Sequence, residues 1–195
     1  MLTSTYSSLY YYHCYEVIEY GGFHGFKYYE GADQEIIKDK DGNIIFDTIG
    51  PTAKASGKVD VATLNHHGHG MSKDYISELD PPIMILQGWS SDQPPNESIQ
   101  MLVDSHVKGR VKPKIFATDI FQDRLKALGS LSRLFRSTSG HVLIRVHPPI
   151  DVNNAKIGSL RGSDTNQQTY EVVVLDANKQ IKKHYGHFPI RKKIE

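Results

Sequence analysis

Short apolar strands alternate with amphipathic helices through the middle of this chain, and this order constrains the fold more than any other feature. The expected strands are residues 59–64, 83–86 and 114–117, and the expected helices are residues 73–79, 97–106 and 124–135. Strands that alternate with helices form a sheet covered by helices. With hairpin patterns at both ends, we expect an α/β fold with one mixed β-sheet flanked by helices.

The two ends of the chain carry patterns typical of antiparallel strands. Aromatic and β-branched residues at 15–18 and 23–29 flank a pair of glycines and predict a β-hairpin. Residues 141–146 and 170–175 predict two further strands, separated by a long polar loop. The stretch from residue 34 to 57 is expected to be a polar connection, and the basic tail from residue 179 to be weakly structured.

Size and charge limit the functions to consider. The 195 residues suit a single domain over 1–195, and Lys plus Arg (23) nearly balance Asp plus Glu (22). This balance gives no reason to expect nucleic acid or an anionic membrane as partner. The only cysteine, Cys14, excludes an intrachain disulfide and a cysteine-based zinc cluster. We expect no membrane span and no signal peptide, hence a cytoplasmic protein by default.

The residues that carry chemistry follow the strand at 59–64, which ends in Asn65, His66, His67 and Gly68. Strand ends fix the backbone while the loop presents side chains, and neutral imidazole is the commonest metal ligand. Adjacent histidines on a strand point to opposite faces, so at most one of them would face a given site. The pair alone leaves a metal ligand and a plain structural histidine both open.

The surrounding phrases strengthen the metal interpretation. The strand that ends in His-His-Gly resembles that of the metallo-β-lactamase-fold hydrolases, in an HHG-motif bacterial branch. Upstream, the strand that ends at Gly31-Ala32-Asp33 resembles the family's strand ending in Gly-Asp. Further similar segments are residues 79–85, 87–94, 115–119 and 140–146. The resemblance covers residues 15–176 and leaves 1–14 and 177–195 as uncertain ends.

The resemblance implies a fold, a cofactor and ligands. The family fold is an αββα sandwich with two zinc ions between its halves, and this chain would be the C-terminal half. Asp33 would be the carboxylate that bridges both ions, and His67 the terminal ligand, with His66 beside it. We therefore expect the Asp33 carboxylate within about 6 Å of an imidazole nitrogen of His66 or His67, a reach set by zinc coordination distances.

One family motif is absent from the sequence. The first half of the family supplies most ligands through HxHxDH, and the nearest phrase here has Met71 and Ser72 where Asp and His are required. The first hypothesis is a metal-dependent hydrolase of a small-molecule substrate, N-terminally truncated and inactive alone. The alternative is a non-catalytic half-domain or structural remnant that needs a separate N-terminal half or self-associates, because a half-sandwich would expose one apolar sheet face.

Several loop residues are candidates for the rim of the metal cleft. They are Trp89, Ser90, Ser91, Asp92, Thr118 and His141. Each follows or begins a predicted strand, and each also has a plain interpretation as a turn former or strand-end residue. Asp119 is expected to be a helix N-cap, and His69 a solvated loop histidine.

Overall fold

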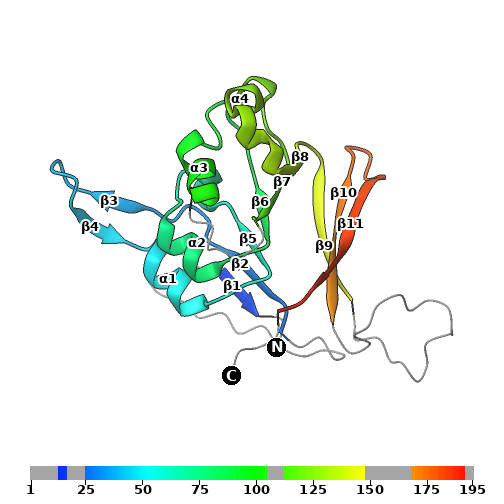
Figure 1. Ribbon diagram of the computed structural model, residues 1–195, viewed down its shortest axis with the longest axis horizontal. Coiled ribbons are helices and arrows are strands. Elements are labelled where there is room, and N and C mark those ends of the chain that lie inside the picture. The colour runs from blue at the N-terminus through cyan, green and yellow to red at the C-terminus, as the bar shows by residue number, and fades with distance from the viewer. Residues whose placement is uncertain (1–12, 17–24, 105–111, 148–167, 192–195) are drawn as a thin grey trace.

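A six-stranded sheet forms the centre of the protein (Figure 1). The computed structural model describes residues 13–16, 25–104, 112–147 and 168–191. The strands, in spatial order, are β1 (His13–Glu16), β2 (Lys27–Glu30), β5 (Val61–Thr63), β6 (Ile83–Leu86), β7 (Lys114–Ala117) and β8 (Phe135–Ser137). β1 runs antiparallel to β2, and the other neighbours are parallel. The expected α/β class with a helix-flanked sheet is confirmed.

Helices cover one face of this sheet. They are α1 (Ile49–Ser56), α2 (Lys73–Leu79), α3 (Asn96–Asp104) and α4 (Gln122–Ala127). α2 shows why local signals predict a helix well: the Ser72 hydroxyl accepts the Tyr75 N–H, and the chain leaves the helix at Asp80 in a left-handed conformation. Tyr75 and Leu79 are fully buried in the core between the helices and the sheet.

A second sheet covers the opposite face. Its antiparallel strands are β9 (His141–His147), β10 (Thr169–Leu175) and β11 (Ile181–Pro189), in the order β11-β10-β9. Val61, Ile83 and Phe116 of the main sheet form a second core with Tyr170 and Val172 of β10. The expectation of an apolar sheet face open to water is therefore wrong for these residues, because β9 to β11 bury it.

Three segments differ from the sequence expectation. Residues 34–57, expected to be a polar connection, form the hairpin of β3 (Ile36–Lys38) and β4 (Ile44–Asp47) followed by α1. The helix expected over 124–135 ends early, and a 3₁₀ turn at Gly129–Leu134 leads into β8. The tail, expected to be weakly structured, contains β11. The turn of the N-terminal hairpin and most of the 151–168 loop lie outside the described residues.

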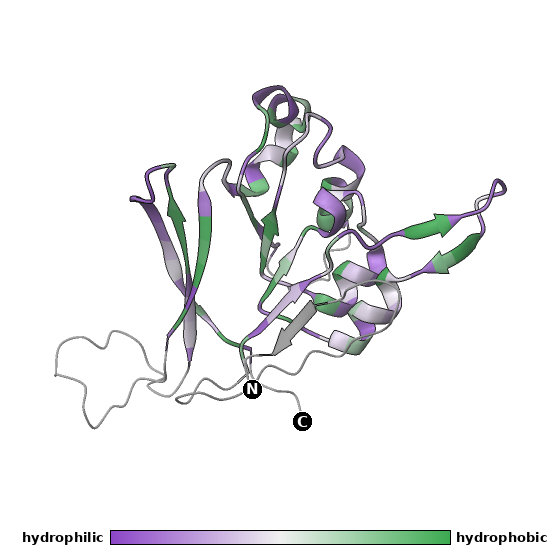
Figure 2. Cartoon of the chain, turned by 180° about the vertical axis from the view of Figure 1, so that it is seen from behind, coloured by the Kyte–Doolittle hydropathy of each residue, from purple (hydrophilic) through white to green (hydrophobic). Residues whose placement is uncertain are grey.

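Exposed apolar side chains concentrate on the β3–β4 hairpin, which projects from the body of the protein (Figures 1 and 2). Ile44 and Ile45 are 58% and 66% exposed, and Ile37 and Phe46 are 43% and 40% exposed. Contiguous exposed apolar surface is typical of an interaction site. Within the described ranges, no helix has the length and apolar character that a membrane span needs.

Candidate functional site

The carboxyl ends of four neighbouring strands open onto one edge of the main sheet. β2, β5, β6 and β7 run parallel, so the loops that follow them leave from the same edge. These loops contain Asp33 after β2, the histidine turn after β5, residues 87–92 after β6 and Thr118 after β7. In open α/β sheets this edge is where ligands bind.

The two adjacent histidines lie in a 3₁₀ turn, Asn65–Gly68, rather than on the strand itself. His66 (φ 47°) and His67 (φ 54°) both have left-handed backbones. For residues with a side chain this conformation costs about 1–2 kcal/mol each, and such strain tends to gather at functional sites. Adjacent side chains point to opposite faces only on a strand, so this expectation does not hold for a turn. The centres of the two imidazole rings lie 6.1 Å apart.

His67 is oriented by a backbone carbonyl. Its Nδ1 lies 2.5 Å from the Gln87 oxygen, which can only accept a hydrogen bond, so Nδ1 carries the proton. In the neutral ring the lone pair is then on Nε2, which lies 3.9 Å from Oδ1 of Asp33. The expected approach of Asp33 to an imidazole nitrogen is confirmed. A hydrogen bond from the far ring nitrogen to a carbonyl is also how metal-binding histidines are commonly fixed.

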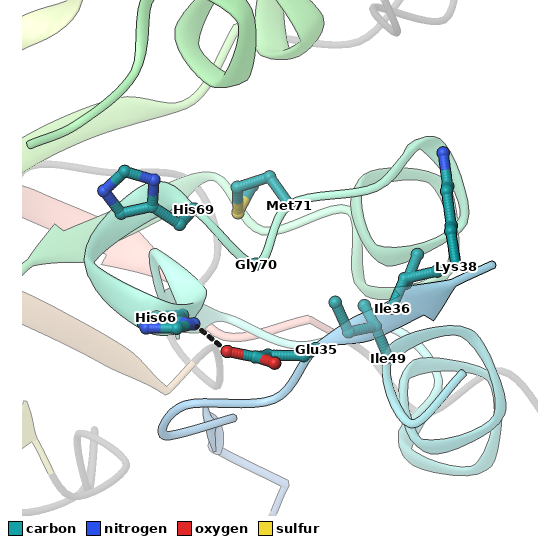
Figure 3. A pocket seen from close by; sticks show the side chains of 8 residues that line it. All are labelled: Glu35, Ile36, Lys38, Ile49, His66, His69, Gly70 and Met71. Atoms are coloured by element: carbon teal, nitrogen blue, oxygen red, sulfur yellow. Dashed lines mark ion pairs between the residues drawn. The ribbon is translucent and has the colours of Figure 1, made fainter. Parts of the chain in front are cut away.

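The neighbouring histidines pair with other carboxylates. His66 Nδ1 lies 3.2 Å from Oε1 of Glu35, the ion pair dashed in Figure 3. His69 Nε2 lies 3.7 Å from Oδ2 of Asp92. His69 is exposed, as expected of a loop histidine, but it has a charged partner. Sequence reasoning missed Glu35, Gln87 and the pairing of His69. For His69, the sequence offered one signal of a role at this site: it lies two residues after His67.

A pocket of about 550 Å³ lies beside this turn (Figure 3). Its lining residues are Glu35, Ile36, Lys38, Ile49, His66, His69, Gly70 and Met71. A smaller hollow of about 160 Å³ is lined by Asp33 and by Ile37 and Phe46 of the exposed hairpin. The edge therefore offers a pocket with both charged and apolar lining beside His66 and His69, and a smaller hollow lined by Asp33.

The candidate rim residues after β6 lie in a hydrogen-bonded loop near the histidines. Trp89 is 71% exposed, and its ring centre lies 6.1 Å from that of His67. The Ser90 hydroxyl donates to Asp92 at 2.5 Å, which holds the Asp92 pKa below its ordinary value, with the charge of His69 contributing less. Ser91 is exposed between them. Trp89 and Asp92 therefore each lie close to a histidine of the turn.

The remaining candidates lie farther along the sheet. The Thr118 N–H and hydroxyl both donate to the Leu86 carbonyl at the end of β6. Asp119 is not a helix N-cap: it bridges to Ser139, and Phe121 occupies the N-cap position of α4. His141 is exposed at the start of β9, in the other sheet, and no contact joins it to the histidine turn.

Asp33 and His67 are two side chains at this edge that could bind a metal ion together. Among the described residues, no group of three or more His, Cys, Asp or Glu side chains could hold a metal ion. Two ligands of one tetrahedral zinc lie ~3.3 Å apart, since each lies ~2.0 Å from the ion. Asp33 and His67 at 3.9 Å are near that separation, and Asp33 is 70% exposed and free to close it. The pair fits two ligands of a zinc ion and leaves the others to be supplied.

A second polar cluster, which sequence reasoning missed, lies on the outer face of the β9–β11 sheet. The Glu171 carboxylate is 8% exposed and contacts Arg145 at 2.8 Å, His184 at 3.1 Å and His147 at 3.6 Å. Burial tends to raise the pKa of Glu171, but the His184 hydrogen bond and the nearby cations outweigh it and lower that pKa. These contacts explain how the buried Glu171 carboxylate is accommodated on β10, the middle strand of this sheet.

Comparisons with family models, with curated proteins and with solved structures found no significant match to this chain. The geometry of the sheet edge is therefore the basis for the functional argument.

Proposed function

We propose that this chain is the C-terminal half of a metal-dependent hydrolase of the metallo-β-lactamase fold. The observation that carries the proposal is the oriented pair: Gln87 fixes His67 so that its Nε2 faces the Asp33 carboxylate at 3.9 Å. Helices on one face of a parallel sheet match one half of an αββα sandwich, although β9 to β11 cover the face on which the other half would pack. Zinc is the expected cofactor, held here by Asp33 and His67.

The chain's own residues have distinct roles in this proposal. Asp33 supplies a carboxylate that two cations can share, and His67 supplies one neutral imidazole nitrogen. His66 pairs with Glu35 at 3.2 Å and lines the 550 Å³ pocket, where a small-molecule substrate would bind. Zinc held by Asp33 and His67, once its remaining ligands were supplied, would provide the chemistry for hydrolysis of an ester, amide or phosphoester by water.

Metal titration tests the proposal. Asp33→Asn and His67→Ala should each weaken Zn²⁺ or Co²⁺ binding by at least ~10-fold, since even outer partners of metal ligands cost that much. His66→Ala is the matched control and should bind nearly as the wild type does. We expect no zinc-dependent hydrolysis by the chain alone until a segment with HxHxDH is added. Equal affinity for wild type and His67→Ala would refute the proposed ligand pair.

A second candidate is a non-catalytic half-domain that associates with a partner half or with itself. The exposed hairpin favours it, because Ile44 and Ile45 present more than half of their surface to water. In this case the Asp33–His67 pair would be a structural remnant.

Measurement of self-association tests the second candidate, the non-catalytic half-domain. We expect concentration-dependent association of the purified chain in light scattering, and the double variant Ile44→Lys, Ile45→Lys should reduce it. Ile181→Lys is the control, since Ile181 on β11 is 57% exposed but lies outside the hairpin. A monodisperse wild-type monomer, or an equal effect of both variants, would contradict association through the hairpin.

A further inference from the structure

A buried asparagine lies directly behind the candidate metal site. Asn65 is fully buried, and its side-chain Nδ2 donates two hydrogen bonds. One goes to the Gln34 carbonyl at 3.1 Å, and the other goes to the Gly70 carbonyl at 3.0 Å. Gln34 directly follows Asp33, and Gly70 lies two residues after the end of the histidine turn. The side chain therefore joins the two loops that carry the proposed ligands.

The backbone adds to this connection. The His66 N–H donates to the Ala32 carbonyl at 2.8 Å, and the Gly70 N–H donates to the Asn65 carbonyl at 3.1 Å. The Asp33 loop is thus held to the turn on both sides, in front by His66 and behind by Asn65. Because His66 and His67 have left-handed backbones, the turn needs such support to persist.

The amide is suited to this position through its donors. A primary amide carries two N–H donors on one nitrogen, and both are used here. Its Oδ1 accepts no hydrogen bond from the described residues, and it packs against Gly31, where an added Cβ would lie 2.4 Å away. An unpaired buried oxygen is costly. Asn65 therefore donates to both loop carbonyls, while its own side-chain oxygen has no donor among the described residues.

We propose that Asn65 is a positioning residue that sets the distance between Asp33 and His67. The proposal rests on the proposed function, because the distance matters only if both side chains bind one metal ion. Asn65 touches neither the ion nor a substrate and acts through the two loops. Loss of its donors would free the Gln34 carbonyl and let the Asp33 loop move away from the turn.

Two substitutions remove these donors in different ways. Asn65→Asp keeps the side-chain volume but places a carboxyl oxygen against two carbonyl oxygens, whereas Asn65→Ala removes the donors and leaves a small cavity. Ser137→Ala is the matched control: Ser137 is also buried, and two carbonyls, those of Ala117 and Ser139, share its single hydroxyl proton. Ser137 lies on β8, away from the histidine turn.

The experiment measures Co²⁺ affinity and the visible spectrum of the Co²⁺ complex for the folded variants. Either Asn65 variant should bind at least ~10-fold more weakly, the loss typical of outer-shell partners, with an altered spectrum. Ser137→Ala should match the wild type in both, even if it loses as much thermal stability. Wild-type affinity and spectrum in both Asn65 variants would overturn the positioning role.

A metal-free measurement separates this proposal from the proposed function. In the apo protein, hydrogen exchange at the His66 N–H should be faster in either Asn65 variant than in wild type or Ser137→Ala. If the wild type binds no metal, the proposed function fails, and this exchange rate still decides whether Asn65 holds the loops together. Unchanged exchange in both Asn65 variants would overturn the inference independently.

Discussion

Asp60→Ala is expected to destabilise the protein by about 2–4 kcal/mol, because it leaves two backbone donors without a partner. Asp60 is 1% exposed and precedes β5. Its two carboxylate oxygens accept the N–H groups of Lys27 and Arg191, both at 2.9 Å. Its carbonyl accepts the Tyr170 hydroxyl at 3.0 Å. One residue thus joins β2 and β5 to the second sheet and to the chain after β11.

The contribution of Asp60 to the unfolding free energy depends on pH, because burial shifts the pKa of its carboxyl group. Burial raises the pKa of Asp60 above its ordinary value of 3.8, and the two N–H donors oppose the shift only in part. A carboxyl with a raised pKa in the folded state binds its proton more tightly there than in the unfolded chain. The part of its contribution that depends on the bound proton is therefore fully present below pH 3.8 and is lost as pH rises through the raised value, whereas the ionised carboxylate keeps both hydrogen bonds.

Chemical denaturation measures both effects. The unfolding free energy of the wild type minus that of Asp60→Asn should fall as pH rises through that window, because asparagine does not titrate. Asp123→Ala is the control, since the Asp123 side chain is 94% exposed in its pair with Lys126, and exposed pairs contribute about 0–1 kcal/mol. A loss below about 0.5 kcal/mol for Asp60→Ala, the range of ordinary surface substitutions, would contradict this account.

Gly70→Ala should destabilise the fold and weaken metal binding together. A Cβ at Gly70 would lie 2.4 Å from the Gln34 carbonyl oxygen and 2.7 Å from Asn65 Nδ2. The Gln34 oxygen belongs to the backbone, so relief requires the Asp33 loop to move away from the histidine turn. Overpacking of this kind costs about 1–3 kcal/mol or more. We expect at least ~10-fold weaker Co²⁺ binding, as for a lost outer-shell partner.

Gly129→Ala separates the clash from the general cost of replacing glycine. Gly129 has φ +54°, and no heavy atom lies within 4 Å of an added Cβ. Its substitution should cost only the left-handed strain, about 1–2 kcal/mol, and leave metal affinity unchanged. If Gly70→Ala retained wild-type affinity for Co²⁺, the close approach of the two loops would not control the site.

The middle of the fold could be predicted because its signals are local. The α2 helix has an N-cap at Ser72 and a proline stop, and β6 is a short, fully buried apolar run. The segment from residue 34 to 57 carries one turn signal, Asp41-Gly42-Asn43, but its polar composition hid the strands on either side. α1 buries only Ile49 and Ala53. Its first two N–H groups are accepted by the Asp47 carboxylate, one residue before the N-cap position, and this capping was not recognised from the sequence. β11 was missed because register shifts and mostly exposed residues hide its alternation.

The candidate site could be predicted only in part. Resemblance to a family motif predicted that Asp33 would approach the histidines, and the 3.9 Å separation agrees. The role of Gln87 depends on the β5–β6 register, and that of Asn65 on a turn with two left-handed histidines. Neither feature has a pattern in the sequence, because each arises where loops from different strands meet.

Anomalous X-ray diffraction from zinc-soaked crystals would test the central claim most directly. We expect an anomalous peak ~2.0–2.2 Å from both the Asp33 carboxylate and His67 Nε2, the coordination distances of zinc. The Nδ1 of the same ring should still donate to the Gln87 carbonyl. A peak between His66 and Glu35, or no peak at this edge under saturating zinc, would contradict the assignment of Asp33 and His67 as metal ligands.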